Sequence, residues 1–337
     1  MKKKTANILS TILWAVLAVV LLWLSMRSVD WKQFGDALKE CRWEWVVLGM
    51  FLGLVVFWIR ALRWRMQILP FDEKVSRMDC FNAYNICMLV NLALPRVGEV
   101  VRCGYVVKHS EKGEDGKPKL SFEKALGTMV TDRLWDIVSI LVIAVLVAVF
   151  LWDRSGSFFK GDLSGAVASK MGLMWIAVAA VVLLALFVFV VWKLRGRGGL
   201  WGKIWGIIEG TKEGLLSCLH MRRGWLFIVY TVLIWVLYWL MCYSCVRALD
   251  RVPEFASLDL GDALFLMFAG SVSSIIPVPG GFGAYHAVVA GALTALCGVP
   301  FGIAMIFATV SHESQAALNA IAGLVSYGAE SFVRKKH

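Results

Sequence analysis

The stretch LWDIVSILVIAVLVAVFLW, residues 134–152, decides the fold class of this chain. An α-helix needs about 20 apolar residues to cross the hydrocarbon core of a bilayer, and this run has that length. Its apolar residues do not alternate with polar ones, as they would in a strand of a membrane barrel. Because only helices and closed barrels satisfy their backbone hydrogen bonds in lipid, the run predicts a membrane-spanning helix.

Similar runs recur along the chain. Hydrophobic residues make up 59% of the 337 residues and charged residues 18%, and the mean hydropathy is +0.70. A soluble domain of this length would carry more charge. The sequence therefore predicts an all-α fold, a polytopic membrane helical bundle that forms a single integral membrane domain over residues 1–337. The other predicted crossings are Asn7–Met26, Trp43–Ile59, Leu173–Trp192, Trp225–Val246 and Phe301–Phe332.

The net charge of +11 has an uneven distribution. Basic clusters alternate with loops of balanced or acidic charge, which is the positive-inside pattern of membrane proteins. The pattern predicts a bacterial-type cytoplasmic (inner) membrane with both termini in the cytoplasm. The excess charge can hold anionic lipid headgroups, so the expected partners are membrane lipids of anionic character and not nucleic acid. The clusters lie at residues 2–4, 60–65, 193–223 and 334–336.

Two other segments of the chain have a predicted place at the membrane. Residues 109–119 are rich in lysine and glycine and are expected to form a charged cytoplasmic loop. Residues 198–219 carry tryptophan, leucine and isoleucine at amphipathic spacing together with lysines, which indicates a helix lying in the interface.

Two further apolar segments are interrupted. Met78–Leu94 contains three asparagines and ends at a proline. If it crossed the membrane fully, the basic loop after it would lie outside, whereas a hairpin that enters and leaves from the cytoplasm keeps this loop inside. Leu264–Ile276 and Ala284–Cys297 form a second hairpin, open to the outside, around the break at Pro277–Gly281. Six full crossings and two oppositely oriented re-entrant hairpins are the arrangement that marks a transporter's midplane site.

The first candidate site follows the first hairpin arm. Pro95 cannot continue a helix, and Gly98 permits the turn that follows it. Arg96, Glu99 and Arg102 recur every third residue, so on a new helix they would share a face with one another. Arginine can grip a phosphate with two hydrogen bonds while a glutamate orients it. The alternative is a structural cluster of ion pairs beside the membrane. Asn91 precedes this break.

The second candidate site is Asp132-Arg133-Leu134-Trp135-Asp136. Asp132 could simply cap the helix that follows it. Asp136 lies inside the apolar run, and an acid within the membrane implies a function and a partner. Asp132 and Asp136 are one turn apart and could both meet Arg133 or the cluster around Arg96. We expect the partner of Asp136 to be Arg96 or Arg102.

The third candidate site is the turn after the second hairpin's first arm, whose N–H groups and following helix start could bind an anion. The alternative is a simple external turn. His286 comes one turn into that helix, and His312 and Glu313 interrupt the final span. A histidine in a membrane helix can equally serve as an interhelical hydrogen bond. The residues of the turn that we expect to contribute are Pro277, Pro279, Gly280, Gly281 and Gly283.

Other chemistry finds no support in the sequence. The chain contains no phosphate-binding loop, no nucleotide fingerprint and no Ser–His–Asp arrangement, so neither a cofactor nor a catalytic residue is expected. The segment beginning at His312 lacks the second histidine of a metalloprotease helix, so no metal is expected either.

Taken together, these motifs resemble the lysylphosphatidylglycerol synthase transmembrane family, also called the flippase-like family. The resemblance implies a stand-alone membrane module, without the soluble aminoacyl-transfer domain of the full synthases, that handles polar-headed lipids. Family members often have glutamate at the position of His286, and Glu313 is a candidate substitute. The matching residues are Asn91, Leu94, Pro95, Gly98, Glu99, Arg102, Asp132, Arg133, Asp136, Pro277, Pro279, Gly280, Gly281 and Gly283.

Three functions are compatible with these motifs. The first is a flippase for an anionic or phosphate-bearing lipid, with Arg96, Arg102 and the proline–glycine turn holding the headgroup and Glu99, Asp136 and His286 as proton carriers. The second is an intramembrane enzyme that uses Asp132 or Asp136 as a base on a lipid phosphate or glycosyl-lipid. The third is a membrane assembly partner without a substrate. The sequence favours the first and leaves the oligomeric state open.

Overall fold

The computed structural model describes residues 31–114, 116–150 and 223–334, together with a few isolated positions. The spans expected at Asn7–Met26 and Leu173–Trp192 lie outside the described residues, apart from isolated positions. The same holds for the interfacial helix expected at residues 198–219. These three expectations therefore stay predictions.

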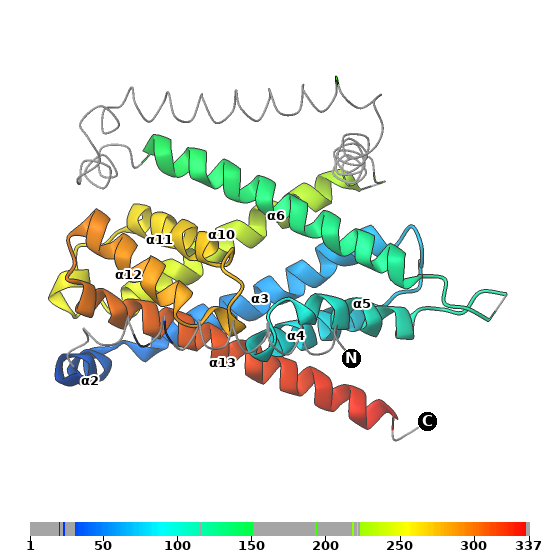
Figure 1. The fold of residues 1–337 in the computed structure, drawn as a ribbon, viewed down its shortest axis with the longest axis horizontal. Coiled ribbons are helices and arrows are strands. Elements are labelled where there is room, and N and C mark those ends of the chain that lie inside the picture. Colours follow the sequence, from blue (N-terminus) through cyan, green and yellow to red (C-terminus); the bar gives the residue numbers. More distant parts are fainter. Residues whose placement is uncertain are drawn as a thin grey trace.

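The described part of the chain is helical, and the predicted all-α fold is confirmed (Figure 1). No strand occurs among these residues; there is one isolated bridge, between Lys112 and Pro118. The short 3-10 helices are η2 (Pro253–Phe255) and η3 (Pro279–Gly281). The α-helices are α2 (Trp31–Glu40), α3 (Trp43–Ile68), α4 (Arg77–Ala93), α5 (Val97–His109), α6 (Phe122–Phe150), α10 (Gly224–Ala248), α11 (Leu260–Ser273), α12 (Ala284–Cys297) and α13 (Phe301–Arg334).

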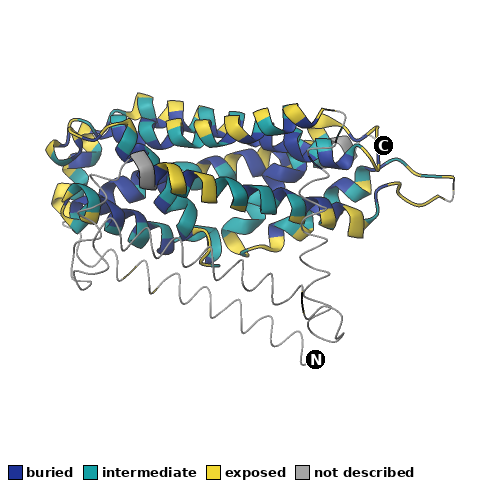
Figure 2. Cartoon of the chain, turned by 90° about the horizontal axis from the view of Figure 1, so that it is seen from above, coloured by how far each residue is buried: buried dark blue, intermediate teal, exposed yellow. Residues whose placement is uncertain are grey.

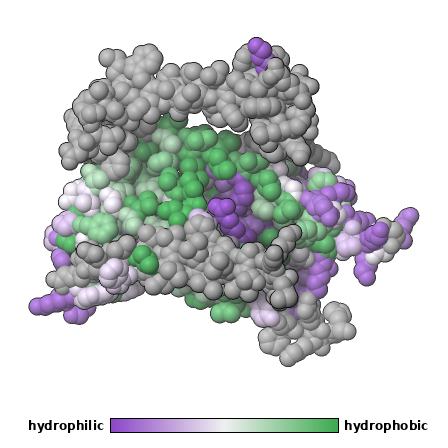
Figure 3. All heavy atoms as spheres, in the orientation of Figure 1, coloured by the Kyte–Doolittle hydropathy of each residue, from purple (hydrophilic) through white to green (hydrophobic). Residues whose placement is uncertain are grey.

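Several helices have the length and composition of membrane spans. Within the described residues, α3, α10 and the segment Pro279–Cys297, which combines η3 and α12, meet both requirements. Apolar side chains cover the middle of the face in Figure 3, where a hydrophilic patch interrupts them, and hydrophilic side chains gather toward the ends. An apolar outer surface of this kind is stable in lipid and not in water. The protein is therefore an integral membrane protein.

The helices pack lengthwise into a bundle whose buried faces point inward (Figure 2). Helix α3 packs on α10, α4 and α13, while α13 also packs on α4 and α12. On α3 the inner face is formed by residues such as Val56, Ala61 and Trp64, each fully buried. Val47 and Phe51 on the outer face are more than half exposed. A helix that is apolar all round and exposed on one side faces lipid there.

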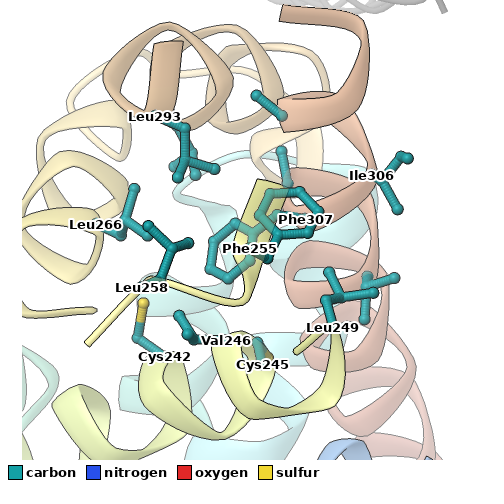
Figure 4. Close-up of a cluster of buried hydrophobic side chains, with 14 of the residues drawn as sticks. Cys242, Cys245, Val246, Leu249, Phe255, Leu258, Leu266, Leu293, Ile306 and Phe307 are labelled. Carbon is teal, nitrogen blue, oxygen red and sulfur yellow. The ribbon is translucent and has the colours of Figure 1, made fainter. Parts of the chain in front are cut away.

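A hydrophobic cluster at one end of the bundle includes buried side chains from α10, η2, α11, α12 and α13 (Figure 4). Phe255 of η2 is fully buried, and its ring lies 6.3 Å from the ring of Phe307 on α13. Leu266 of α11 and Leu293 of α12 pack into the same cluster. Because the loop after α10 inserts its phenylalanine here, it anchors α11 and α12 to α13.

The charged segment expected at residues 109–119 lies near the opposite end of α13. It begins and ends slightly later in the chain than predicted. Helix α5 includes His109, and the loop runs from Ser110 to the start of α6. Glu111 accepts hydrogen bonds from Lys74 at 2.5 Å and Lys119 at 2.6 Å, and the two ammonium groups lower the pKa of its carboxyl. The loop is thereby linked to the turn between α3 and α4.

Candidate functional site

The break between α4 and α5 is formed by three residues, Leu94 to Arg96. Leu94 is extended (φ −128°, ψ 99°), as expected before a proline. Arg96 has φ 65°, and no other non-glycine residue in the described ranges has a positive φ. Asn91 closes the turn because its Oδ1 accepts from the Gly98 N–H at 2.9 Å. The predicted interruption is present, but the left-handed residue is Arg96 and not Gly98.

Gly98 is required here for a different reason, the close approach of α5 to α4. A Cβ at this position would lie 2.2 Å from the carbonyl oxygen of Cys87 and 2.6 Å from Oδ1 of Asn91. The carbonyl belongs to the backbone and cannot rotate away. Gly98 therefore lets the two arms of this hairpin touch.

We expect Gly98→Ala to lower the free energy of unfolding by about 1–3 kcal/mol, the usual cost of overpacking. Gly104→Ala is the matched control, since it lies on the same helix and a Cβ there would meet nothing within 4 Å. That control should be neutral or slightly stabilising, because alanine is the better helix former. Thermal unfolding of the two detergent-purified variants measures the difference, and equal midpoints would contradict the close approach.

A buried network of ion pairs lies between α3, α5 and α6. Arg63 of α3 contacts Asp132 at 2.8 Å and Asp136 at 2.7 Å. Arg60 contacts Asp136 at 2.9 Å, and Arg102 of α5 contacts Asp132 at 3.4 Å. All five side chains are at most 10% exposed. Charges removed from water are stable only when paired in this way, so the network joins three helices.

Arg133 and Glu99 extend this network toward the surface. Arg133 contacts Glu99 at 2.8 Å and Asp136 at 3.6 Å, and its side chain is 37% exposed. Asn91 also donates to Glu99, at 3.4 Å. The turn between α4 and α5 is thus connected through Glu99 to the acids of α6. We call the residues Arg60, Arg63, Glu99, Arg102, Asp132, Arg133 and Asp136 the charge network.

Several expected roles within this network are wrong. Asp132 does not cap a helix, because α6 begins ten residues earlier at Phe122. The partners of Asp136 are neither Arg96 nor Arg102 but Arg60, Arg63 and Arg133. Two contacts do agree with the sequence, those of Arg133 with Asp136 and of Arg102 with Asp132.

The predicted face of Arg96, Glu99 and Arg102 does not form either. Arg96 precedes the first turn of α5, and its Nη2 donates to the Ile275 carbonyl at 3.5 Å. Glu99 orients Arg133 instead of Arg96 or Arg102. The two breaks therefore lie side by side, as the contact between α4 and η3 also shows.

Sequence reasoning missed Arg60 and Arg63. It assigned them to the cytoplasmic flank of a span ending at Ile59, but α3 continues to Ile68 and both arginines are buried. The usable signal was their three-residue spacing, which places both on one face of a helix. Two acids one turn apart on another apolar helix require such partners.

The charge network has one more basic than acidic group. Four arginines face three acids, a net charge of +1 when all are ionised. Within the described residues, Nε and Nη1 of Arg102 have no hydrogen-bond partner although the side chain is 1% exposed. Its guanidinium lies 4.0 Å from the centre of the Trp64 ring. Free donors on a buried arginine suit an anionic oxygen.

The second break separates α11 from α12, as predicted. Gly280, Gly281 and Gly283 all have positive φ, between 58° and 79°, which explains why glycine is needed there. Pro277 precedes this turn and Pro279 begins η3. The N–H groups of Gly281 and Phe282 donate within the turn, at 3.1 Å each. The anion nest predicted here would therefore depend on the turn's other N–H groups.

The structure brings together the three polar residues that interrupt α12 and α13. Nδ1 of His312 lies 3.2 Å from Oε1 of Glu313, and Nε2 of His286 lies 3.5 Å from the same oxygen. His312 also contacts the Gly280 carbonyl through Nε2, at 2.9 Å. One ligand atom from each of the three side chains lies within 4.8 Å of the others, close enough to hold a metal ion together.

The comparisons with known proteins agree with these motifs. The family model for the lysylphosphatidylglycerol synthase TM region matches residues 11–323. No curated protein and no solved structure matches the chain. The matched range includes both helix breaks, the charge network and the two histidines. The chain therefore belongs to the family of the lysylphosphatidylglycerol synthase transmembrane region, a membrane family of lipid metabolism and transport.

Proposed function

We propose that this protein is a flippase, which moves an anionic or phosphate-bearing lipid across the cytoplasmic membrane. Its family membership makes membrane lipids its partners. The observation that carries the proposal is Arg102, a buried arginine with two unsatisfied donors in a network of net positive charge. A lipid phosphate would satisfy those donors and balance that charge.

The proposed topology places this site between the leaflets. Six crossings, with both termini in the cytoplasm, surround two oppositely oriented re-entrant hairpins, α4–α5 and α11–α12. The Arg96–Ile275 contact supports a common site for their breaks. The headgroup would pass along Arg96, Arg102 and the turn at Pro279–Gly283, while the acyl chains stay in lipid. Interrupted helices around a polar site are the usual plan of a secondary transporter.

Lipid movement by the purified protein in liposomes tests this function. A membrane-impermeant reductant destroys the fluorescence of labelled phosphatidylglycerol in the outer leaflet. Movement of labelled lipid from the inner to the outer leaflet therefore appears as a further loss of fluorescence. We expect Arg102→Ala to slow movement by about 10-fold to 100-fold, the worth of a hydrogen bond to a charged group. Asp132 keeps Arg63 as a partner in this variant, so the fold should survive.

Arg247→Ala is the control, because this arginine pairs with Asp250 after α10, outside the charge network. It should move lipid as the unmodified protein does. Unchanged movement by folded Arg102→Ala would contradict the headgroup role. Recovery of a chemically altered lipid would favour the intramembrane enzyme, and no movement of any lipid would favour an assembly partner.

A further inference from the structure

The polar residues of α12 and α13 form a compact group with an unusual pattern of contacts. His286 is fully buried, His312 is 9% exposed and Glu313 is 46% exposed. A single carboxylate oxygen, Oε1 of Glu313, contacts a nitrogen from each ring, at 3.5 Å for His286 and 3.2 Å for His312. The group is therefore closed on the histidine side and accessible on the glutamate side.

The protonation of His312 follows from its second contact. Nε2 lies 2.9 Å from the Gly280 carbonyl oxygen, which can only accept a hydrogen bond, so Nε2 carries the hydrogen. In the neutral ring Nδ1 is then an acceptor, and it points at a carboxylate oxygen that is also an acceptor. Two acceptors 3.2 Å apart need either a hydrogen or a metal ion between them.

His286 adds a second, independent observation. Its Nδ1 has no hydrogen-bond partner within the described part of the chain, and its Nε2 has only the long contact with Glu313 at 3.5 Å, although the side chain is fully buried. An unsatisfied buried polar group costs about 1–3 kcal/mol. A cation bound to Nε2 would remove that cost, and the nearest charged oxygen is again that of Glu313.

We propose that His286, His312 and Glu313 bind a divalent transition-metal ion of the zinc class. Zinc–ligand bonds of about 2.0–2.1 Å at tetrahedral angles place neighbouring ligand atoms about 3.3 Å apart. The two separations to Glu313, 3.2 and 3.5 Å, match that value, and the ligand nitrogens of the two histidines lie within 4.8 Å of each other. Two imidazoles and a carboxylate suit zinc, whereas magnesium and calcium prefer oxygen ligands alone.

The surroundings of this site agree with a metal centre. A metal-binding histidine usually donates its other ring N–H to a carbonyl, as His312 does to Gly280. That carbonyl belongs to the turn between α11 and α12, so metal binding would also fix the turn against α13. Three protein ligands leave a fourth position open for water or an anion. No short sequence motif indicates this site, because its two histidines lie on different helices.

Equilibrium dialysis of the full-length, chelator-treated protein in detergent against buffered Zn2+ tests the proposal. Elemental analysis should show one more bound zinc in the unmodified protein than in Glu313→Gln. We expect His286→Leu and Glu313→Gln to weaken this binding at least about 10-fold to 100-fold, since even outer partners of a metal site have that effect. Co2+ should produce the visible absorption of a tetrahedral site, and both variants should lose it.

His109→Leu is the matched control. His109 also faces a carboxylate, Glu330 on α13, at 3.1 Å, but within the described residues no second histidine accompanies that pair. Its zinc content should equal that of the unmodified protein. If His286→Leu does not fold, the half-exposed Glu313→Gln decides the matter. Equal zinc content in Glu313→Gln and the unmodified protein would overturn the site and leave a proton as the shared cation.

Discussion

Replacing Arg63 with methionine is expected to lower the free energy of unfolding by about 3–5 kcal/mol, the cost of removing one member of a buried ion pair. The side chain is fully buried and is shared by Asp132 and Asp136, at 2.8 and 2.7 Å. Without it both acids stay buried with weaker partners, Arg102 at 3.4 Å and Arg60 at 2.9 Å. Methionine keeps much of the volume, so the loss reports on charge and not on packing.

The measurement is unfolding by dodecyl sulfate in mixed micelles, followed by circular dichroism. Lys39→Met is the control, because it also removes one ion pair, the contact of Lys39 with Asp36 at 2.8 Å. Both side chains of that pair are more than half exposed. Exposed pairs contribute about 0–1 kcal/mol, so this variant should unfold almost as the unmodified protein does. If Arg63→Met lowered the free energy of unfolding no more than Lys39→Met does, the network would not hold the three helices together.

Replacing Phe255 with alanine is expected to cost about 3–5 kcal/mol, the range for a phenylalanine removed from a packed core. Its ring is fully buried between the ends of α10, α11 and α13 and packs on Phe307. The backbone of Phe255 is held by hydrogen bonds to Val252 and Leu258, which keep η2 from moving into the space. The cavity would therefore persist, and the second hairpin would lose its anchor to α13.

The same unfolding assay measures this loss. Phe51→Ala on the outer face of α3 removes the same atoms from a side chain that is 60% exposed. Lipid can fill the space there, so the change should stay within about 0.5 kcal/mol. A similar loss in both variants would contradict the packing of the loop after α10. Because the charge network lies elsewhere, Phe255→Ala should destabilise the protein without a specific loss of lipid binding.

The breaks in the helices could be predicted because their causes are local. Pro95 cannot donate to the ladder of α4, and glycines are needed where φ is positive, at Gly280 and Gly281. The length of α3 was harder to predict, because the arginines after Ile59 resemble a cytoplasmic flank. Arginines lower the hydropathy of a segment and so end a predicted span. Buried acids on another helix can nevertheless stabilise arginines within a membrane helix.

The sequence by itself determined the class of this protein, a helical membrane bundle of a lipid-related family, and the positions of its two breaks. The class follows from the hydrophobic length that a lipid environment requires. The breaks follow from the backbone chemistry of single proline and glycine residues. Only the tertiary structure decided which charges pair, with Arg63 between Asp132 and Asp136, and brought His286 to Glu313. Partners 69 or 27 residues apart meet through the packing of whole helices, and nothing in the local sequence specifies that packing.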